Sequence, residues 1–284
     1  MNIDVWKTMY DKDFDPVKYL YHYTNIEKAI KILHSESLRF SSISRTNDTS
    51  ESKLKISYEG DSPHLYEKIE TVYNYFKDNI GRIRLLCFSM DIPIADADRS
   101  SVDKFLQVDP RYEFQDITGR GFASPRMWAQ YAKNNEGVCF VVNKGKLNQQ
   151  IKRKTAFYRE SKVNYRRFFE CYKIKEQKLN EIYDKIYVSG TTMFIKMLEN
   201  DEFFLEHNFF TKSKDWENEC EYRYVTAIDD MNIDVHAENL FGYLEGIVVG
   251  ENIDPAHKKV IELLLGGRTQ VMSIVFGNTI SMLR

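Results

Sequence analysis

A run of alternating charge near the C-terminal third of the chain contains residue types that can act on a ligand. It extends from Trp216 to Tyr224. In an extended strand successive side chains point to opposite faces, so the charged residues would share one face. Like charges on one face are unfavourable unless water, a cation or a positively charged ligand lies among them. The run therefore predicts an acidic ligand-binding face made of Glu217, Glu219, Glu221 and Arg223.

A second interpretation of this run needs no ligand. An edge strand with a solvated charged face keeps sheets from pairing with each other, and such a strand has the same sequence pattern. The residues alone leave both interpretations open.

The composition is that of an ordinary soluble globular protein. Of the 284 residues, 43% are hydrophobic and 29% are charged, and the formal net charge is -2. This balance argues against a strongly basic nucleic-acid-binding protein, although local basic patches are compatible with it. The 18 Tyr and 18 Phe residues indicate an aromatic core with some rings available for stacking on a ligand.

The four cysteines are far apart and form no CxxC pair, so the sequence predicts neither a zinc site nor a compact disulfide framework. The stretch from Met1 to Trp6 lacks the features of a signal peptide, and no window approaches the roughly 20 apolar residues of a membrane span. We expect a reduced, cytoplasmic protein without a membrane partner.

Hydrophobic periodicity gives the expected elements. Strands are expected at 19–24, 38–42, 84–89, 137–142, 244–250 and 270–275, and helices at 26–33, 65–80, 127–132, 165–210 and 255–265, the fourth interrupted at Gly190. Residues 44–64 and 91–118 are expected to be polar connections. Strands at both ends of the chain around a helical middle favour a single α+β domain over residues 1–284, with a helical insertion at 165–210.

Five separated segments follow one pattern. They are His22 to Thr24; the strand from Leu38 to Ser42 with Asn47 and Asp48 beyond it; Cys87 to Ser89; Met127 to Ala132 with Gly137 to Cys139; and Trp216 to Arg223. Together they resemble a bacterial family, domain of unknown function 2971, from about Tyr19 to Ile274. The chain departs from the family pattern at Thr49, where a proline is expected, and at Tyr222, where a tryptophan is expected.

A fainter resemblance is to folds of the ADP-ribosyltransferase type, which have a mixed or antiparallel split sheet and bind nicotinamide adenine dinucleotide (NAD). This resemblance implies catalysis by Glu221, with Glu219 orienting the nucleophile and Glu217 facing solvent. His22 would contact ribose or phosphate. The remaining residues implied to bind the dinucleotide are Tyr23, Ser41, Ser42, Asn47 and Arg223. A carboxylate suits this chemistry because positive charge grows on the ribose as nicotinamide leaves.

Several of these residues also have a structural interpretation. His22 can be a hydrogen-bonded core histidine, and Asn47 and Asp48 are common turn residues. Trp128 and Tyr131 lie on one helix face and are more often core than ligand platform. Arg223 can serve only to orient Glu221 or Glu219.

The sequence is therefore compatible with three functions. The first is an enzyme that cleaves the nicotinamide–ribose bond and transfers ADP-ribose to a nucleic acid, a protein or water, by analogy a toxin or defence effector. The second is a metal-dependent phosphodiesterase that uses Glu217, Glu219, Glu221 and Asp48, although Arg223 beside these carboxylates argues against it. The sequence predicts no specific metal site and no oligomeric state.

The third function is a non-catalytic module that binds a nucleotide or a partner. Its strongest feature is a run of basic residues that can meet phosphates, with Tyr158 and Tyr165 among them. A solvated helix or strand face is the usual explanation for such a run. The basic residues are Lys144, Lys146, Lys152, Arg153, Lys154, Arg159, Lys162, Arg166 and Arg167.

Overall fold

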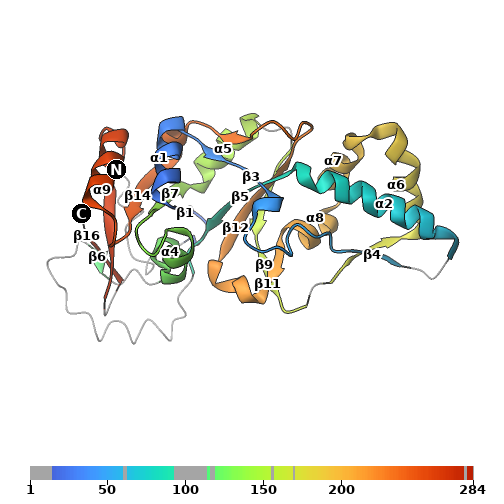
Figure 1. The fold of residues 1–284 in the computed structure, drawn as a ribbon, viewed down its shortest axis with the longest axis horizontal. Coiled ribbons are helices and arrows are strands. Elements are labelled where there is room, and N and C mark those ends of the chain that lie inside the picture. Colours follow the sequence, from blue (N-terminus) through green and yellow to red (C-terminus); the bar gives the residue numbers. More distant parts are fainter. Residues whose placement is uncertain are drawn as a thin grey trace.

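The computed structural model describes residues 15–59, 63–92, 114–115, 119–154, 157–168, 170–277 and 280–283. The stretch from Met1 to Trp6 and most of the connection from Asp91 to Thr118 lie outside these residues. The chain is α+β and is built around a mixed sheet, as predicted (Figure 1). None of the described helices is both long and apolar enough to span a membrane.

The first unit is a strand, a capped helix and two short strands. β1 (Tyr19–Thr24) leads into α1 (Ile26–Ser35), whose first turn is closed by Asn25 accepting a hydrogen bond from the Lys28 amide. The single strand expected at 38–42 is two, because the chain changes partners between Arg39 and Ser41. β2 (Leu38–Arg39) pairs with β13 (His236–Ala237), whereas β3 (Ser41–Ser42) pairs with β5 (Ile83–Ser89).

The main sheet, as far as it is described, has ten strands in the order β6-β16-β15-β14-β7-β1-β5-β12-β8, with β3 beside β5. β14 and β15 are parallel, and the other neighbours are antiparallel. The strands not yet named are β6 (Phe114–Gln115), β7 (Val138–Asn143), β8 (Arg159–Lys162), β12 (Glu221–Ala227), β14 (Leu244–Val249), β15 (Val271–Phe276) and β16 (Ile280–Leu283).

The predicted helices are present, but α5 was not predicted, and the segment after Gly190 forms two helices, α7 and α8, where one was expected. They are α2 (Tyr66–Asn79), α4 (Pro125–Tyr131), α5 (Lys144–Lys154), α6 (Glu176–Ser189), α7 (Thr191–Asn200), α8 (Glu202–Phe209) and α9 (Pro255–Leu265). Gly190 separates α6 from α7 with a φ of 50°, as the sequence predicted.

The predicted helix at 165–210 begins too early. Before Glu176 the chain forms β9 (Asn164–Arg166), paired with β11 (Thr211–Ser213), and β10 (Tyr172–Lys175), paired with β4 (Ile56–Glu59). β4 lies in the segment expected to be a polar connection. Each of these strands is only three or four residues long and pairs with a distant one, so local periodicity does not reveal it.

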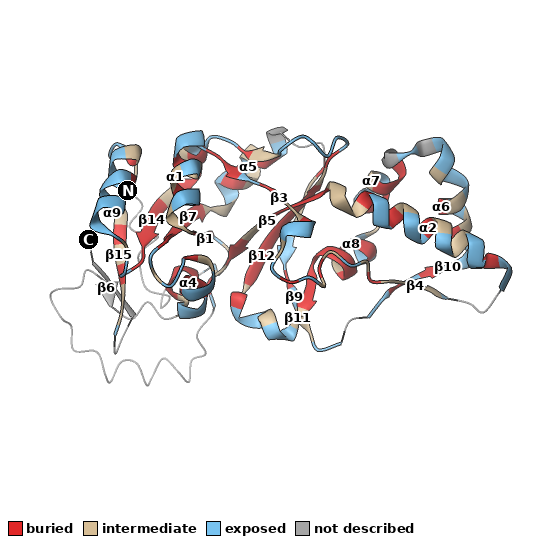
Figure 2. Cartoon of the chain, in the orientation of Figure 1, coloured by how far each residue is buried: buried red, intermediate tan, exposed pale blue. Residues whose placement is uncertain are grey.

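The strands of the main sheet are largely buried (Figure 2), and its two faces are covered differently. One face packs under α1, α5 and α9 as a continuous core. The other face has two separate cores. In the first core, α4 packs against β1, β7, β14 and β15. In the second core, α2 and α6 to α8 pack against β5 and β12. Between these two cores the same face carries polar side chains.

Gly250 follows β14 at the turn towards α9, and the close packing around it leaves no space for a side chain. A Cβ at this position would lie 2.1 Å from the Asn135 carbonyl oxygen. The Gly250 amide also donates to the Gly137 carbonyl oxygen at 3.1 Å. The glycine is thus explained by a close approach of two backbone segments.

We expect Gly250→Ala to destabilise the fold by about 1–3 kcal/mol, because backbone atoms would have to shift to admit the methyl group. Gly145→Ala is the matched control, since its Cβ would meet only the Asn143 Oδ1 at 3.4 Å. Urea unfolding followed by circular dichroism measures both. Equal unfolding midpoints for Gly250→Ala and the wild type would contradict the packing explanation.

Candidate functional site

The acidic run from Trp216 to Tyr224 is not one strand. Residues Lys214–Glu219 form a 3-10 helix, and Cys220 follows in the left-handed conformation with a φ of 44°. The Ser213 hydroxyl accepts from the Asp215 amide and so caps the short helix. β12 begins only at Glu221. The prediction of one shared face is therefore wrong for Glu217 and Glu219 and holds for Glu221 and Arg223.

β12 is not a solvated edge strand either. It lies between β5 and β8, and its residues from Glu221 to Thr226 are buried. The solvated-edge interpretation is wrong. Glu217 does face solvent, with half of its side chain exposed.

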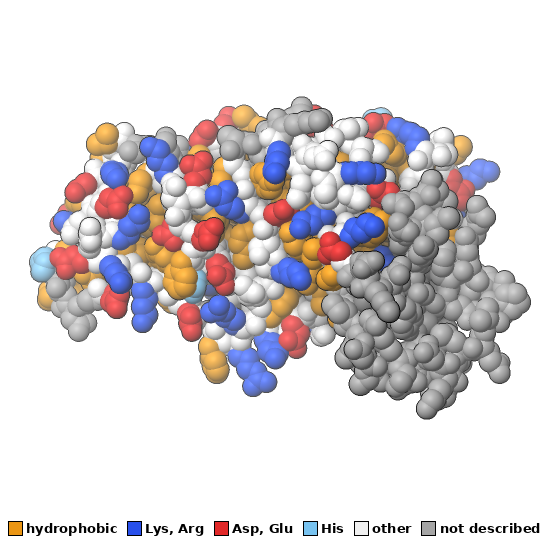
Figure 3. Space-filling view, turned by 180° about the vertical axis from the view of Figure 1, so that it is seen from behind, with side chains coloured by type: hydrophobic (Ala, Val, Ile, Leu, Met, Phe, Trp, Pro, Cys, Tyr) orange, Lys and Arg blue, Asp and Glu red, His pale blue; other side chains and the backbone are white. Residues whose placement is uncertain are grey.

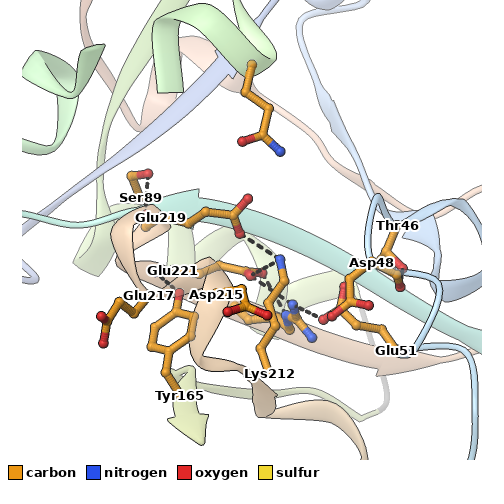
Figure 4. Close-up of polar contacts among 12 residues, drawn as sticks. Thr46, Asp48, Glu51, Ser89, Tyr165, Lys212, Asp215, Glu217, Glu219 and Glu221 are labelled. Carbon is orange, nitrogen blue, oxygen red and sulfur yellow. Dashed lines mark hydrogen bonds and ion pairs between the residues drawn. The ribbon is translucent and has the colours of Figure 1, made fainter. Parts of the chain in front are cut away.

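Arg223 is the centre of a buried charge cluster, of which Figure 4 labels Glu51, Lys212, Glu219 and Glu221. Its Nε and Nη2 atoms donate to the two carboxylate oxygens of Glu221 at 2.7 and 2.8 Å. Nη2 also reaches Glu51 at 2.5 Å, and Nη1 donates to the carbonyl oxygen of Phe209 at 2.8 Å. The guanidinium joins β12, the loop that carries Glu51 and the end of α8.

Lys212, on β11, links this ion pair to Glu219. Its ammonium lies 2.6 Å from the Glu219 Oε2 and 3.5 Å from the Glu221 Oε2. The Lys212 ammonium also lies 4.6 Å from the centre of the Trp216 ring, which places an aromatic face against the cation.

These contacts set the protonation of the cluster. Burial alone raises the pKa of Glu221, but Arg223 and then Lys212 outweigh burial and lower that pKa to about 2. Burial lowers the pKa of Arg223 and of Lys212, and the surrounding carboxylates reverse this effect, so both pKa values are raised. Glu221 is therefore an ionised partner of Arg223 over the physiological range.

Glu219 is held differently from Glu221. Its Oε1 accepts from the Tyr131 hydroxyl at 2.6 Å, and its Oε2 accepts from Lys212. The Ser89 hydroxyl donates to the Glu219 carbonyl oxygen at 2.7 Å, which fixes the backbone. Burial, followed by the nearby Glu219 charge, raises the pKa of Tyr131. Tyr131 therefore stays protonated and acts as a donor to the carboxylate.

A cavity of about 1030 Å³ lies above this cluster. It forms where β1 and β5 share only one register pair, Tyr21 with Ser89, while β1 follows β7 over six. The two strands therefore separate beyond that pair. The cavity is lined from α4 by Tyr131, from the loop after β3 by Thr46 and Asn47, and from the cluster by Glu51, Lys212, Glu219, Glu221 and Arg223.

Most of the predicted site residues line this cavity. His22, Tyr23, Ser41, Asn47, Glu219, Glu221 and Arg223 do so. Ser42 is not among the described residues that line it. Its hydroxyl instead caps the 3-10 turn at Ile43–Arg45 and bonds to the Ser44 hydroxyl at 2.9 Å.

His22 lies across the sheet from Glu221. In the strand register, Tyr21 is paired with Ser89, and Ser89 is paired with Glu221. These three side chains therefore share one face of the sheet, and the next residue, His22, points to the other face. The His22 ring bonds through Nδ1 to the Cys87 carbonyl oxygen at 3.1 Å and packs against Phe88. Burial lowers its pKa. Both residues reach the cavity, but from opposite faces at the opening between β1 and β5.

Two other predicted residues have clear structural contacts. The Tyr23 hydroxyl donates to the Gly121 carbonyl oxygen at 2.6 Å, and its ring packs edge-on against Trp128. Asp48 forms a turn by accepting from the Ser50 amide at 2.8 Å, as the turn interpretation predicted. Trp128 is fully buried, as predicted for a core residue, whereas Tyr131 on the same helix reaches the cavity.

Sequence reasoning missed Glu51 and Lys212. Glu51 lies in a loop rich in polar residues, and nothing in its neighbourhood distinguishes it from a solvated glutamate. Lys212 lies on a three-residue strand within the segment predicted to follow a helix. The one available signal was the single cation among the carboxylates of the acidic run, because such an imbalance predicts a further positive group from elsewhere in the chain.

The basic run from Lys144 to Arg167 does not form one continuous surface. It is divided among α5, β8 and β9. Lys146 pairs with Glu245, and Arg166 pairs with Glu170 and Glu206. The Tyr165 hydroxyl accepts from the Glu221 amide at 2.9 Å and so supports the cluster from below. On the face shown in Figure 3, positive and negative side chains are interspersed over the described surface.

The geometry does not favour a hard-cation site. Within the described ranges, no group of three or more His, Cys, Asp or Glu side chains is arranged to hold a metal ion. Lys212 and Arg223 already pair with Glu219 and Glu221, two of the four carboxylates that the phosphodiesterase hypothesis assigned to the metal. The four cysteines, all of them described, are free thiols.

One family model matches the part of the chain that contains the centre of this site. Residues 127–224 match the family model described as protein of unknown function (DUF2971). The predicted resemblance to this family is thus confirmed over a segment that contains Tyr131, Lys212, Glu219, Glu221 and Arg223. The DUF2971 segment does not include His22, Ser41 or Glu51. No curated protein and no solved structure gives a significant match to the chain.

The Glu221–Arg223 pair predicts a specific pH dependence of stability. The pKa of Glu221 is about 2 in the folded chain, whereas an unfolded glutamate has a pKa of about 4.3. The pair therefore stabilises the fold fully above pH 4.3, and this contribution, on the order of 3 kcal/mol, is lost as the pH falls through 2. We expect the stability gap between wild type and Glu221→Gln to narrow between pH 4.3 and pH 2.

Urea unfolding at a series of pH values measures this gap. Glu217→Gln is the matched control from the same segment, because its exposed carboxylate should leave stability nearly unchanged at every pH. A gap for Glu221→Gln that is constant with pH would show that Arg223 does not act through the ionised carboxylate.

Proposed function

We propose that the chain binds NAD, cleaves the nicotinamide–ribose bond and transfers ADP-ribose to a macromolecular acceptor or to water. The observation that carries this proposal is the Glu219 carboxylate, fixed by Tyr131 and Lys212 where it reaches a cavity of about 1030 Å³. A carboxylate held in this way stabilises positive charge as it develops on a bound ligand.

The cluster has a formal negative charge, which favours a ligand whose reacting centre is positively charged. Among the buried ionisable side chains described around Arg223, carboxylates outnumber cations by one. Burying a negative charge without a partner is unfavourable, so a ligand that brings positive charge is favoured here. Oxidised nicotinamide and the ribosyl cation that follows it both meet this requirement. The buried groups are Asp48, Glu51, Glu219 and Glu221 against Lys55, Lys212 and Arg223.

The reaction breaks one bond and forms one bond. The bond between the ribose C1′ and the nicotinamide nitrogen breaks, and its electron pair leaves with nicotinamide. A nucleophile from the acceptor, or water, then bonds to C1′ and releases a proton. Glu219 stabilises the ribosyl cation and can accept this proton.

The contacts favour Glu219 over Glu221 for this role. Both oxygens of Glu221 are bound by the buried Arg223 guanidinium, so Glu221 acts as a positioning residue for the cluster. Glu219 instead shares its oxygens between Tyr131, which comes from α4, and Lys212. A small rotation of the tyrosine would leave one Glu219 oxygen available to the ribose.

The segment from Arg39 to Asn47 is suited to the rest of the dinucleotide. Ser41 and Asn47 offer polar groups to the cavity, and Arg39 and Arg45 supply positive charge for a diphosphate. His22 approaches from the opposite face of the sheet, so its contact would be with a part of the dinucleotide distant from Glu219.

Glu219→Gln should slow nicotinamide release far more than it weakens NAD binding, because an amide keeps the shape but loses the charge that the reacting centre needs. We expect a loss of at least about 100-fold in kcat, the scale for removing one electrostatic contact to a transition state. Tyr131→Phe should lower kcat less than Glu219→Gln. Isothermal titration with NAD and chromatography of released nicotinamide are the two measurements.

Glu217→Gln is the matched control and should retain full turnover. Absence of NAD binding by the wild type at millimolar concentration would refute the proposal. Binding without turnover, unchanged in Glu219→Gln, would instead indicate a non-catalytic nucleotide-binding module.

A further inference from the structure

We propose that the acceptor of ADP-ribose is an unpaired base in a single-stranded nucleic acid, with its phosphates along a row of cations at the cavity mouth. This inference rests on the proposed function and names the acceptor class at the same site. The row is formed by Lys28 and Lys31 of α1 and by Lys133 after α4, with the His34 imidazole beside them. All four are exposed and line the cavity.

The spacing of these residues places them on one side of the helix. Lys28, Lys31 and His34 are three residues apart, so they lie along one face of α1 over about 9 Å. Neither Lys28 nor Lys31 has an ion-pair partner among the described residues, whereas Lys133 pairs with Glu136 at 2.7 Å. The charge of the two α1 lysines is thus directed at solvent or a ligand.

The mouth carries more positive charge than a dinucleotide requires. Arg45, which lines the cavity from the turn after β3, likewise has no ion-pair partner in the described part of the chain, and Arg39 is 3.6 Å from Asp234. One diphosphate can be neutralised on the Arg39 and Arg45 side. The α1 lysines are then left for a second anion, and a polyanionic strand is the acceptor that fits them.

The depth of the reacting group indicates that the acceptor base is unpaired. The Glu219 side chain is only 4% exposed, at the floor of the cavity. A base stacked in a duplex cannot reach such a floor, so an enzyme must take it from a single strand or turn it out of the helix. The cavity volume of about 1030 Å³ is slightly above the range of about 300–1,000 Å³ for small-molecule pockets, which leaves space for a base beside the dinucleotide.

The step itself needs no further reactant. A ring N–H or an exocyclic amino group of the base bonds through its nitrogen to C1′ of the ribose as the bond from C1′ to nicotinamide breaks. Nicotinamide leaves with the electron pair. The proton lost by the base passes to Glu219 and then to solvent.

Binding of a fluorescein-labelled single-stranded oligonucleotide of mixed sequence tests this assignment. We expect the wild type to bind it in preference to its duplex, with affinity that falls between about 50 and 200 mM salt. The double variant Lys28→Gln with Lys31→Gln should bind more weakly, and its slope of log K against log salt should be smaller by about 1.4, because two phosphate contacts are lost. Mass spectrometry should show ADP-ribose added to the strand when NAD is present.

The matched control is Lys152→Gln with Lys162→Gln, which removes two exposed lysines of the basic run outside the cavity. It should leave both affinity and slope unchanged. Equal weakening by the two double variants, or no binding by the wild type, would overturn the inference. If nicotinamide release then persisted, NAD cleavage would stand with a protein or water as acceptor. Oligonucleotide binding through Lys28 and Lys31 without NAD cleavage would instead overturn the enzymatic proposal and with it the acceptor role.

Discussion

The site depends on the burial of one guanidinium. Arg223 is 1% exposed, and a charge taken so far out of water is tolerated only when it is paired and hydrogen-bonded. Its contacts with Glu221, Glu51 and the Phe209 carbonyl oxygen meet this condition from three parts of the chain. The same contacts fix the position of β12 relative to the loop after β3 and to α8. The two walls of the cavity are therefore linked through this one side chain.

The buried charge cluster around Arg223 lies between two separate hydrophobic cores on one face of the main sheet. On the face that carries Glu221, the core under α4 ends at Tyr21 and Tyr23, and the core under the helical region begins at Leu85 and Val225. Neither set of helices covers the strip between them. The strip is filled instead by the buried charged cluster, whose groups pair with one another and still border the cavity. The cavity therefore results from the same arrangement that divides this face into two cores.

Local pattern was sufficient for most of the longer elements, α5 excepted, and insufficient for the site. α9, with proline at its start and glycine after its end, and β7, a run of β-branched and aromatic residues, are determined by neighbouring residues and were predicted nearly to the residue. The acidic run was recognised, but its conformation was not. A capping serine and a left-handed Cys220 decide that conformation, and alternation of charge gives no sign of either. Glu51 and Lys212 depend on pairing between distant segments, which no local pattern encodes.

The different environments of the two central carboxylates follow from this conformation. Had the run been one strand, Glu219 and Glu221 would be about 7 Å apart along one face and equivalent with respect to Arg223. The turn at Cys220 instead leaves Glu221 with the guanidinium and directs Glu219 towards Tyr131 and Lys212. Two neighbouring carboxylates in different environments can take different roles, one holding the architecture and the other meeting the ligand. The short helix before β12 thus separates the two roles within three residues of sequence.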